Sequence, residues 1–555
     1  MIRKLLAFLT RRKGNSATEI ASQPIIYGYH RSAPLLLRAI CIVGLVIGCV
    51  LYGYSFGLFA PARMMPFVAP IALVGGLVLW CLPPGEYAPT RMLEPLFVAF
   101  FAALVLWPNY LALAVANLPW MTFLRITGTP LIIALLACVS ISHRFRAKML
   151  AILSADKVMF RLVLALAGLW TFSILLSSDP GQTINRYIIA MVNLIGIFFV
   201  SCYLFNRPGF TEMWVRMLLV MLTVVCVMGV WEYRIQSLPW AAHIPSFLKI
   251  EDPIVQKILS SGLTRTEIYR IKGTATTPLG LGEILGLAMP FAMHFALGRY
   301  GMITRAAAVV FIPMAAWVIL LTDSRLGFVA GCASVLFYML IWAILRWRQN
   351  RNSLFAPAIV LSYPAIFVAF MAATFLITRL RNEFWGTGEQ QYSTQSRLDQ
   401  WAVGLPKVLQ NPIGTGIGQG GQTLGWTNLA GTLTIDSYWL SVLLEIGVVG
   451  FLVFYGLMLR AAFTAARVAV THSGKPEIDL LLPISVALLN FVIVKMVFSQ
   501  EANHPLIFMM LGAVVALAHR AEKNSPARLV GGPVEAIRGK VAQNRPGGGR
   551  RPTRR

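Results

Sequence analysis

Long apolar stretches recur along the whole chain, and they constrain its fold more than any other feature. A bilayer-spanning helix needs about 20 apolar residues, and about fourteen stretches meet that condition. Only 13% of the residues are charged and the mean hydropathy is +0.69, whereas soluble domains carry about 25% charged residues. The sequence therefore predicts an all-α polytopic membrane protein with about 12–14 transmembrane helices. The expected spans begin near residues 35, 64, 92, 122, 158, 186, 212, 278, 305, 326, 355, 437, 480 and 504.

The positive charges of the chain lie mostly in alternate loops and at the two ends, which is the distribution of cytoplasmic flanks. Fourteen spans then place both termini in the cytoplasm, with 1–33 as an N-terminal segment, 34–520 as the membrane body and 521–555 as a disordered basic tail. The net charge of +26 does not indicate nucleic-acid binding, because no folded basic domain is present. The charges that set this orientation are Arg3, Lys4, Arg11, Arg12, Lys13, Arg144, Arg146, Lys148, Arg346, Arg348 and Arg351.

Two long polar loops, 233–277 and 379–435, fall on the opposite, periplasmic side in this topology. The second loop contains apolar residues at helical spacing between residues 398 and 409, which predicts an amphipathic helix capped by Ser396. A glycine-rich stretch, Gly414–Gly421, follows and predicts a close-packed turn region. It is not a dinucleotide-binding loop, because no strand precedes it.

Three arginines gather on the periplasmic side at the expected membrane boundary: Arg270, Arg325 and Arg397. Arginine stays charged and its planar guanidinium binds phosphate oxygens two at a time. Each arginine alone could be an interfacial cation or a local ion pair. Three together, where basic residues are usually scarce, predict a shared site for a lipid-linked diphosphate. Fixed cations there would stabilise a leaving diphosphate.

Asp436 opens a span at the same depth and is the candidate general base for an acceptor hydroxyl; the alternative is a helix N-cap. Lys272, beside Arg270, and Lys495, within a span, are candidate substrate-binding cations. Lys495 could instead pair with Glu283 or Glu445. His504 is a further candidate for substrate binding or for a second base, or a plain surface histidine.

Four stretches resemble the O-antigen ligase/polymerase superfamily of bacterial membrane glycosyltransferases. The resemblance lies in their order and spacing and covers about 265–460 closely. The stretches are Arg270–Pro278 (RIKGTATTP), Asp323–Gly327 (DSRLG), Arg397–Trp401 (RLDQW) with Asn411–Gly416 (NPIGTG), and Asp436–Leu440 (DSYWL) with Glu445–Gly447 (EIG).

The resemblance implies a GT-C-like helical fold in the bacterial inner membrane and glycan transfer on its periplasmic face. It implies undecaprenyl-diphosphate-linked saccharides as donor and acceptor, with no metal or cofactor. Arg270 and Arg397 would bind the diphosphate, and Arg325 would support the same pocket. Membrane lipids surround such an enzyme, and a chain-length regulator or export complex is the protein partner left open.

The residue at 436 separates two activities within the resemblance. By this resemblance, ligases that attach O-antigen to lipid A core need a histidine where this chain has an aspartate. The acidic residue favours a polymerase of surface-polysaccharide repeat units over a ligase acting on lipid A core or on protein. The rival from another class is a transporter or flippase of lipid-linked saccharides, which predicts ionisable or unwound positions near the bilayer midplane.

Overall fold

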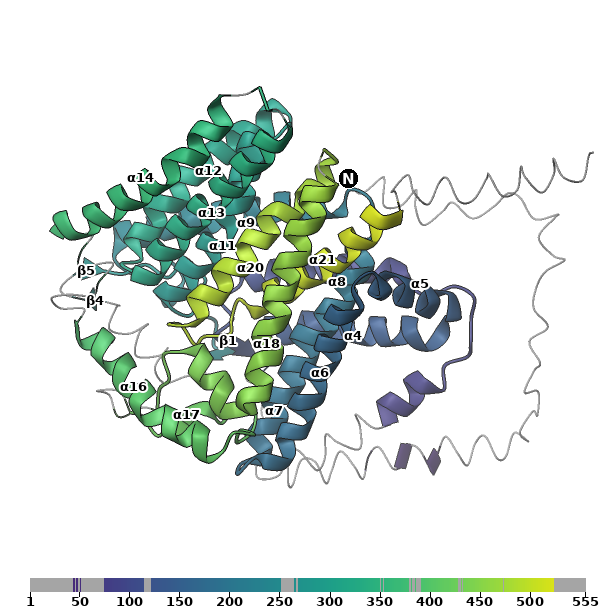
Figure 1. Ribbon diagram of the computed structural model, residues 1–555. Helices are drawn as coiled ribbons and strands as arrows, with labels where there is room; N and C mark the ends of the chain where they lie inside the picture. The colour runs from purple at the N-terminus through teal and green to yellow at the C-terminus, as the bar shows by residue number, and fades with distance from the viewer. Residues whose placement is uncertain are drawn as a thin grey trace, which may run out of the picture. The chain divides into compact units, whose positions relative to one another are not determined.

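The computed structural model describes residues 74–523, apart from 114–120, 251–263, 266–267, 350, 353, 379–380, 382–384, 386–390, 428–430, 432 and 473, together with 43–44, 46–47 and 50. The expected segment 1–33, most of the first two expected spans, and all but residues 521–523 of the expected tail 521–555 lie outside the described residues. Residues 521–523 continue the last helix. Residues 72–555 form one compact unit, and every contact below lies within it (Figure 1).

Eleven helices in the described part are long and apolar enough to cross a membrane. In chain order they match the fourth to fourteenth spans expected from the sequence, so the prediction of an all-α polytopic membrane protein is confirmed. Several spans combine consecutive helical elements. The helices are α3 (Leu93–Leu106), α4 (Phe123–Ile141), α5 (His143–Leu153), α6 (Lys157–Ser173), α7 (Pro180–Ala190), α8 (Ile197–Phe205), α9 (Phe210–Ile235), α11 (Pro278–Leu297), α12 (Met302–Leu321), α13 (Arg325–Gln349), α14 (Phe355–Leu376), α16 (Gln391–Gln410), α17 (Gly420–Leu424), α18 (Tyr438–Thr471), α19 (Pro476–Asp479), α20 (Leu481–Lys495) and α21 (His504–Lys523).

Short helical turns connect several of these helices. They are η2 (Thr90–Met92), η3 (Ser154–Asp156), η4 (Ile174–Leu176), η6 (Ala241–His243) and the π-helical turn η5 (Met191–Gly196), which joins α7 to α8.

Two small antiparallel sheets form between loop segments that connect the helices. One has the order β2-β1-β3, with Ala112 opposite both Thr122 and Lys249; the other pairs β4 with β5. The third expected span is shortened to the 14 residues of α3, because the chain leaves the helix before Trp107-Pro108. The strands are β1 (Leu111–Leu113), β2 (Met121–Thr122), β3 (Leu248–Ile250), β4 (Thr264–Arg265) and β5 (Ile268–Tyr269).

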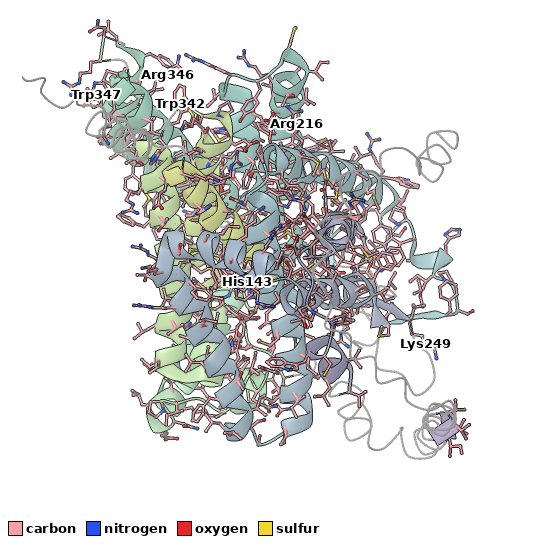
Figure 2. All side chains as sticks on the ribbon, turned by 90° about the vertical axis from the view of Figure 1, so that its right-hand side faces the viewer. His143, Arg216, Lys249, Trp342, Arg346 and Trp347 are labelled. Carbon is pink, nitrogen blue, oxygen red and sulfur yellow. The ribbon has the colours of Figure 1, made fainter. Side chains whose placement is uncertain are left out.

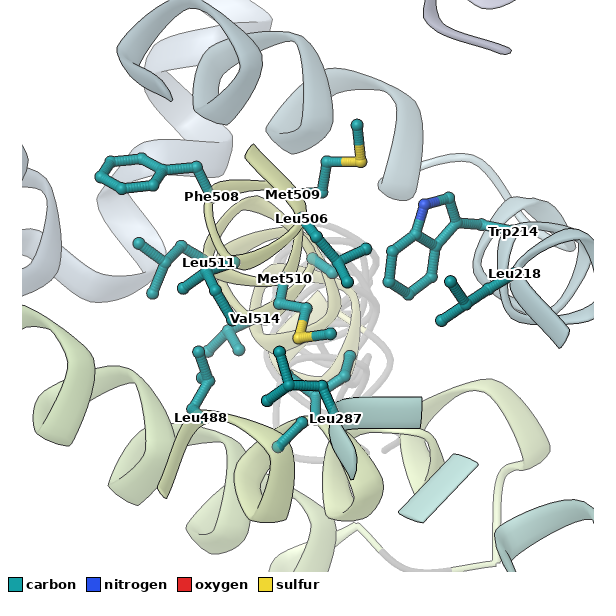
Figure 3. Close-up of a cluster of buried hydrophobic side chains, with 14 of the residues drawn as sticks. Trp214, Leu218, Leu287, Leu488, Leu506, Phe508, Met509, Met510, Leu511 and Val514 are labelled. Carbon is teal, nitrogen blue, oxygen red and sulfur yellow. The ribbon is translucent and has the colours of Figure 1, made fainter. Parts of the chain in front are cut away.

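Helices α11 and α21 form the centre of the body. In each of them 89% of the most apolar 18-residue stretch is buried, whereas the corresponding fraction in α14 is 6%. Helix α11 packs on α12, α13 and α20, while α21 packs on α8 and α18. Figure 3 shows α21 surrounded by Trp214 from α9, Leu287 from α11 and Leu488 from α20. Small residues allow α21 and α8 to approach each other closely, since a Cβ on Gly512 of α21 would lie 2.4 Å from the Ser201 side chain of α8.

Arg216, near the start of α9, and Arg346, near the end of α13, lie at the same end of the body (Figure 2). The predicted topology places both of these ends on the cytoplasmic side. The opposite ends of the helices, where α11, α18 and α21 begin, therefore form the face predicted to be periplasmic, and the following subsection concerns that face.

The amphipathic helix expected in the second long loop is present as α16, and it ends before Asn411-Pro412 as expected. It begins at Gln391, so the prediction of Ser396 as its N-cap is wrong. Helical residues upstream of Ser396 carry little apolar signal, which is why the sequence pattern places the start too late.

Helix α18 is broken at Gly447, whose φ of 72° and ψ of −173° are not helical. The break leaves the carbonyls of Leu444 and Glu445 without helical partners, and the N–H groups of Thr415 and Gly416 donate to them at 2.9 Å each. A Cβ on Gly447 would lie 2.1 Å from the Pro412 carbonyl oxygen. The glycine-rich stretch is thus the close-packed turn region predicted from the sequence, and it packs against the broken helix.

Candidate functional site

The loop that carries Arg270 is fixed by a buried carboxylate, Glu232, near the end of α9. Glu232 accepts hydrogen bonds from the Tyr269 hydroxyl (3.1 Å) and from the backbone N–H groups of Lys272 (3.1 Å) and Gly273 (2.8 Å). Gly273 adopts a φ of 54°, which suits the tight turn. The sequence reasoning missed Glu232, although an acidic residue at the end of an apolar span is itself a signal of a buried polar contact.

Arg270 lies against the short link between α12 and α13. Its Nε donates to the Thr322 carbonyl at 3.0 Å and lies 3.9 Å from Oδ2 of Asp323. Asp323 has a φ of 45°, an unusual conformation that makes this link tight. Ser324 then caps α13 by accepting from Gly327 N–H at 3.2 Å, so Arg325 stands at the first position of that helix, two residues from Asp323.

Arg325 connects this link to the amphipathic helix α16. Its guanidinium donates to the Thr394 hydroxyl at 3.1 Å. Arg397 lies three residues after Thr394, and therefore on the same face of α16. All three arginine side chains are partly buried. Arg270 thus contacts the α12–α13 link, Arg325 joins that link to α16, and Arg397 lies one turn further along the same face of α16. These three arginines are called the arginine row below.

The same face of α16 reaches Asp436. Gln400, one turn after Arg397 and almost fully buried, donates from Nε2 to the Asp436 carboxylate at 3.1 Å and accepts from the Asp436 backbone N–H at 2.9 Å. The N-cap of α18 is Ser437, which accepts from Leu440 N–H. The alternative of Asp436 as the helix N-cap is therefore excluded, and Gln400 holds its carboxylate against α16, the helix that carries Arg397.

Lys272 turns away from the arginine row into the protein. Its Nζ is buried and lies 4.6 Å from the centre of the Tyr110 ring. Burial lowers the pKa of Lys272 to about 8, and the Glu232 carboxylate opposes part of that shift. The main contribution of Lys272 to the loop is its backbone bond to Glu232.

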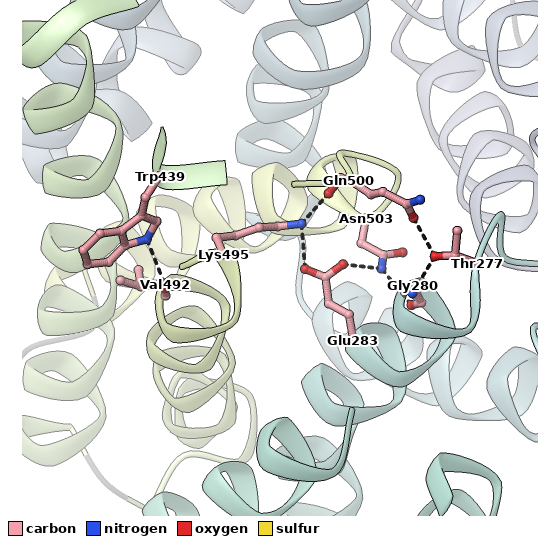
Figure 4. Close-up of polar contacts among 8 residues, drawn as sticks. All are labelled: Thr277, Gly280, Glu283, Trp439, Val492, Lys495, Gln500 and Asn503. Atoms are coloured by element: carbon pink, nitrogen blue, oxygen red, sulfur yellow. Dashed lines mark hydrogen bonds and ion pairs between the residues drawn. The ribbon is translucent and has the colours of Figure 1, made fainter. Parts of the chain in front are cut away.

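Lys495 forms the ion pair with Glu283 that the sequence left as one alternative (Figure 4). The pair is 2.9 Å long and both side chains are buried. Asn503 donates to the other Glu283 oxygen at 2.7 Å, and Lys495 also donates to the Gln500 carbonyl. This network joins the start of α11 to the link between α20 and α21.

His504 is 1% exposed, so it is not the surface histidine that the sequence left as an alternative. Its ring lies 4.7 Å from that of Tyr438 and 5.3 Å from that of Phe491. Neither ring nitrogen has a hydrogen-bond partner among the described residues.

A cavity of about 680 Å³ opens beside His504. Its wall is built by α7, the start of α18, the turn 417–422 and the link 499–505. Glu445 of α18, two residues before the break at Gly447, lines the cavity and accepts from the Ser441 hydroxyl at 2.9 Å. Sequence reasoning did not find this cavity, because its walls come from segments between residues 109 and 505.

No group of three or more His, Cys, Asp or Glu side chains within the described residues could hold a metal ion.

Comparison with known proteins identifies the middle of the chain. Residues 308–455 match the protein family described as O-Antigen ligase, a stretch that contains Arg325, Arg397 and Asp436. No curated protein matches the chain. Among solved structures, a chain from "Structural coordination of polymerization and crosslinking by a peptidoglycan synthase complex" aligns at 13% identity over 67% of this chain and 99% of that chain, with a TM-score of 0.33. A similarity at that TM-score supports no conclusion about this chain.

Proposed function

We propose that this chain, whose residues 308–455 match the O-Antigen ligase family, is a membrane glycosyltransferase that polymerises undecaprenyl-diphosphate-linked oligosaccharide repeat units on the periplasmic face of the inner membrane. The observation that carries the proposal is the arginine row together with Asp436, which Gln400 joins to the helix that carries Arg397. This set contains three fixed cations and one carboxylate from four separate segments of the chain. A diphosphate at headgroup level and a sugar in water fit such a row at the membrane boundary.

In the proposed reaction, an acceptor sugar hydroxyl attacks the anomeric carbon of the glycan carried by the donor lipid. The bond between that carbon and the diphosphate oxygen breaks, and undecaprenyl diphosphate leaves with the electron pair. Asp436 takes the hydroxyl proton. Arg270, Arg325 and Arg397 stabilise the charge that builds on the diphosphate, without having to reorganise as it forms.

In the proposal, Lys272 and Lys495 do not contact the diphosphate; each stabilises a segment next to the site. Lys272 holds the Arg270 loop through Glu232, and Lys495 holds the start of α11 through Glu283. A direct bond from either ammonium to the diphosphate would require the side chain to leave a buried position.

We prefer a polymerase to a ligase because residue 436 is acidic, whereas the resemblance implies a histidine at this position in the ligases. His504 lies on α21, outside the matched residues 308–455, and is the other candidate for the general base. The experiment that separates the two activities is a profile of lipid-linked and released glycans in a deletion strain. Single repeat units without long polymer support a polymerase, whereas long polymer retained on the carrier lipid supports a ligase.

One observation favours the transporter alternative. The break in α18 at Gly447, next to the buried Glu445, is the kind of interrupted helix that transporters use at a substrate site. The two functions differ in where substrate accumulates when the arginine row is removed. In Arg270→Ala and Arg397→Ala strains, a polymerase leaves short lipid-linked units on the outer leaflet, and a flippase leaves them on the inner leaflet.

A further inference from the structure

The cavity beside His504 has the size and chemistry of a ligand site that is separate from the arginine row. Its volume of about 680 Å³ lies within the usual range of about 300–1,000 Å³ for small-molecule pockets. None of the three arginines of the row lines it. The charged and titratable side chains in its wall are Arg125, Arg186, Glu445, Glu501, Tyr438 and His504.

The charge in this wall is balanced, which distinguishes the cavity from a diphosphate site. Two guanidinium groups face two carboxylates, and Arg186 lies 3.9 Å from Glu501. Arg125 bonds the Asn185 side chain at 3.4 Å. A wall with no net excess of positive charge gives little attraction to an anion. Paired carboxylates and amides suit a neutral molecule with many hydroxyl groups, because each carboxylate oxygen accepts hydrogen bonds and donates none.

Glu445 is held in place by Ser441 of the same helix and by the neighbouring turn at Gly420. Its carboxylate accepts from Ser441, and Gly420 of the neighbouring turn approaches so closely that a Cβ there would lie 2.8 Å from Glu445 Oε1. Lys495, the cation that could have neutralised Glu445, is paired with Glu283 instead. The carboxylate therefore remains part of the cavity wall.

His504 supplies an independent sign of a ligand. Both of its ring nitrogens are buried without a hydrogen-bond partner among the described residues, and the ring lines the cavity. The side-chain oxygens of Asn109 and Asn193, in the same wall, are likewise buried without a partner in the described part of the chain. A buried polar atom left without a partner is costly. Sugar hydroxyls, which both donate and accept, would satisfy all of these groups.

The cavity also adjoins the proposed base. Ile435 lines the cavity, and the next residue is Asp436, which contacts α16. The Ile435 carbonyl accepts from Ser499, and Ser499 lines the cavity too. Asp436 does not line the cavity itself, but it directly follows a residue that does and is joined through Gln400 to the helix that carries Arg397.

We infer that this cavity is the acceptor site, in which Glu445 and His504 hold the terminal neutral sugar of the acceptor glycan so that its hydroxyl faces Asp436. The inference rests on the proposed glycosyltransferase function and adds a second subsite to it. Donor diphosphate and acceptor sugar then occupy different walls of the same face.

Gly421 offers a direct test, because it lines the cavity and a Cβ there would meet nothing within 4 Å. Gly421→Leu should narrow the cavity, because its Cβ has room and the larger side chain extends from a residue that lines the wall. Gly456→Leu is the matched control, since Gly456 also faces open space but does not line the cavity. Glu445→Gln and His504→Gln remove single ligand groups, and Glu86→Gln changes a surface carboxylate that pairs with Arg144 as a control.

The full chain in lipid nanodiscs would be titrated with two probes. One is the repeat-unit oligosaccharide released from the host's lipid-linked fraction by mild acid, which carries no diphosphate; the other is undecaprenyl diphosphate, which carries no sugar. We expect Gly421→Leu to abolish oligosaccharide binding, and Glu445→Gln and His504→Gln each to weaken it about tenfold or more. Undecaprenyl diphosphate affinity should stay unchanged in all three variants.

The outcomes separate this inference from the function on which it rests. Oligosaccharide that fails to bind wild type, or that binds Gly421→Leu as it binds Gly456→Leu, overturns the acceptor site while undecaprenyl diphosphate still binds. If undecaprenyl diphosphate also fails to bind wild type, the proposed function itself fails. Should Glu445→Gln or His504→Gln not fold, as judged by thermal melting, the Gly421→Leu comparison decides alone.

Discussion

Asp436 and Gln400 are joined by two hydrogen bonds, one to the Asp436 carboxylate (3.1 Å) and one from its backbone N–H (2.9 Å). The pair ties the start of α18 to the face of α16 that carries Arg397. A carboxylate held this way is oriented before substrate arrives, which is what a general base requires. The local sequence around Asp436 does not contain this information, because Gln400 lies 36 residues away.

Replacing Asp436 with Asn should remove the base and keep the side chain in position, since the amide oxygen of Asn can still accept a hydrogen bond from Gln400. We expect the rate of glycan transfer at saturating donor to fall by about 10²–10⁴-fold, the usual contribution of general acid–base catalysis. Undecaprenyl diphosphate affinity should not change. The measurement is polymer formation by purified protein with lipid-linked repeat units. An unchanged rate in Asp436→Asn would remove Asp436 from the mechanism.

Lys495→Met should destabilise the protein strongly, because it leaves Glu283 buried without its cation. Breaking one partner of a buried pair costs about 3–5 kcal/mol. The double variant Lys495→Met with Glu283→Met should recover part of that loss, since apolar side chains can replace a buried pair. Thermal melting in nanodiscs measures both. If Lys495→Met instead melts like wild type and loses undecaprenyl diphosphate affinity, Lys495 binds substrate directly.

Gly447→Ala should disrupt the break in α18. A φ of 72° is strained for alanine, at a cost of about 1–3 kcal/mol, and the added Cβ would collide with the Pro412 carbonyl. Gly456→Ala in the same helix is the control, because its Cβ meets nothing and alanine favours a helix by about 0.5–1 kcal/mol. The yield of folded protein and its melting temperature test this. Equal behaviour of the two variants would contradict the described break.

The pKa of Lys272, lowered by burial from 10.5 to about 8, predicts a pH-dependent stability. Between pH 8 and 10.5 the unfolded chain binds more protons at this lysine than the folded chain does, so the free energy of unfolding rises with pH in that window. Below pH 8 both forms are protonated and the destabilising effect of the buried charge is constant. Wild type should therefore gain stability relative to Lys272→Met as the pH rises above about 8. A difference in melting temperature that does not change between pH 7.5 and about 9.5 would exclude this burial effect.

Much of the membrane body could be predicted from the sequence, because an apolar stretch of about 20 residues almost always forms a membrane-spanning helix. The amphipathic pattern after Leu398 predicted α16, and the glycine-rich stretch predicted close packing. Both follow from local rules. The start of α16 was placed too late, because its first residues are polar and carry no periodic signal.

The break at Gly447 and the cavity could not be predicted in the same way. Glycine is common in membrane helices, so Gly447 gives no sign of its φ in the sequence. The cavity depends on which segments pack around His504, and that packing joins α7 to the links before α18 and α21. Sequence order and depth placed the three arginines on one face, but their contacts with Thr322, Asp323 and Thr394 depend on the fold.

Binding of undecaprenyl diphosphate by purified protein in nanodiscs tests the central claim most directly. The variants are Arg270→Ala and Arg397→Ala, and the control is Arg234→Ala, an exposed arginine at the end of α9 on the same face. Loss of a charge-assisted contact to phosphate should weaken affinity by about tenfold or more in each variant, with Arg234→Ala unchanged. Wild-type affinity in both Arg270→Ala and Arg397→Ala would show that the arginine row does not hold the diphosphate.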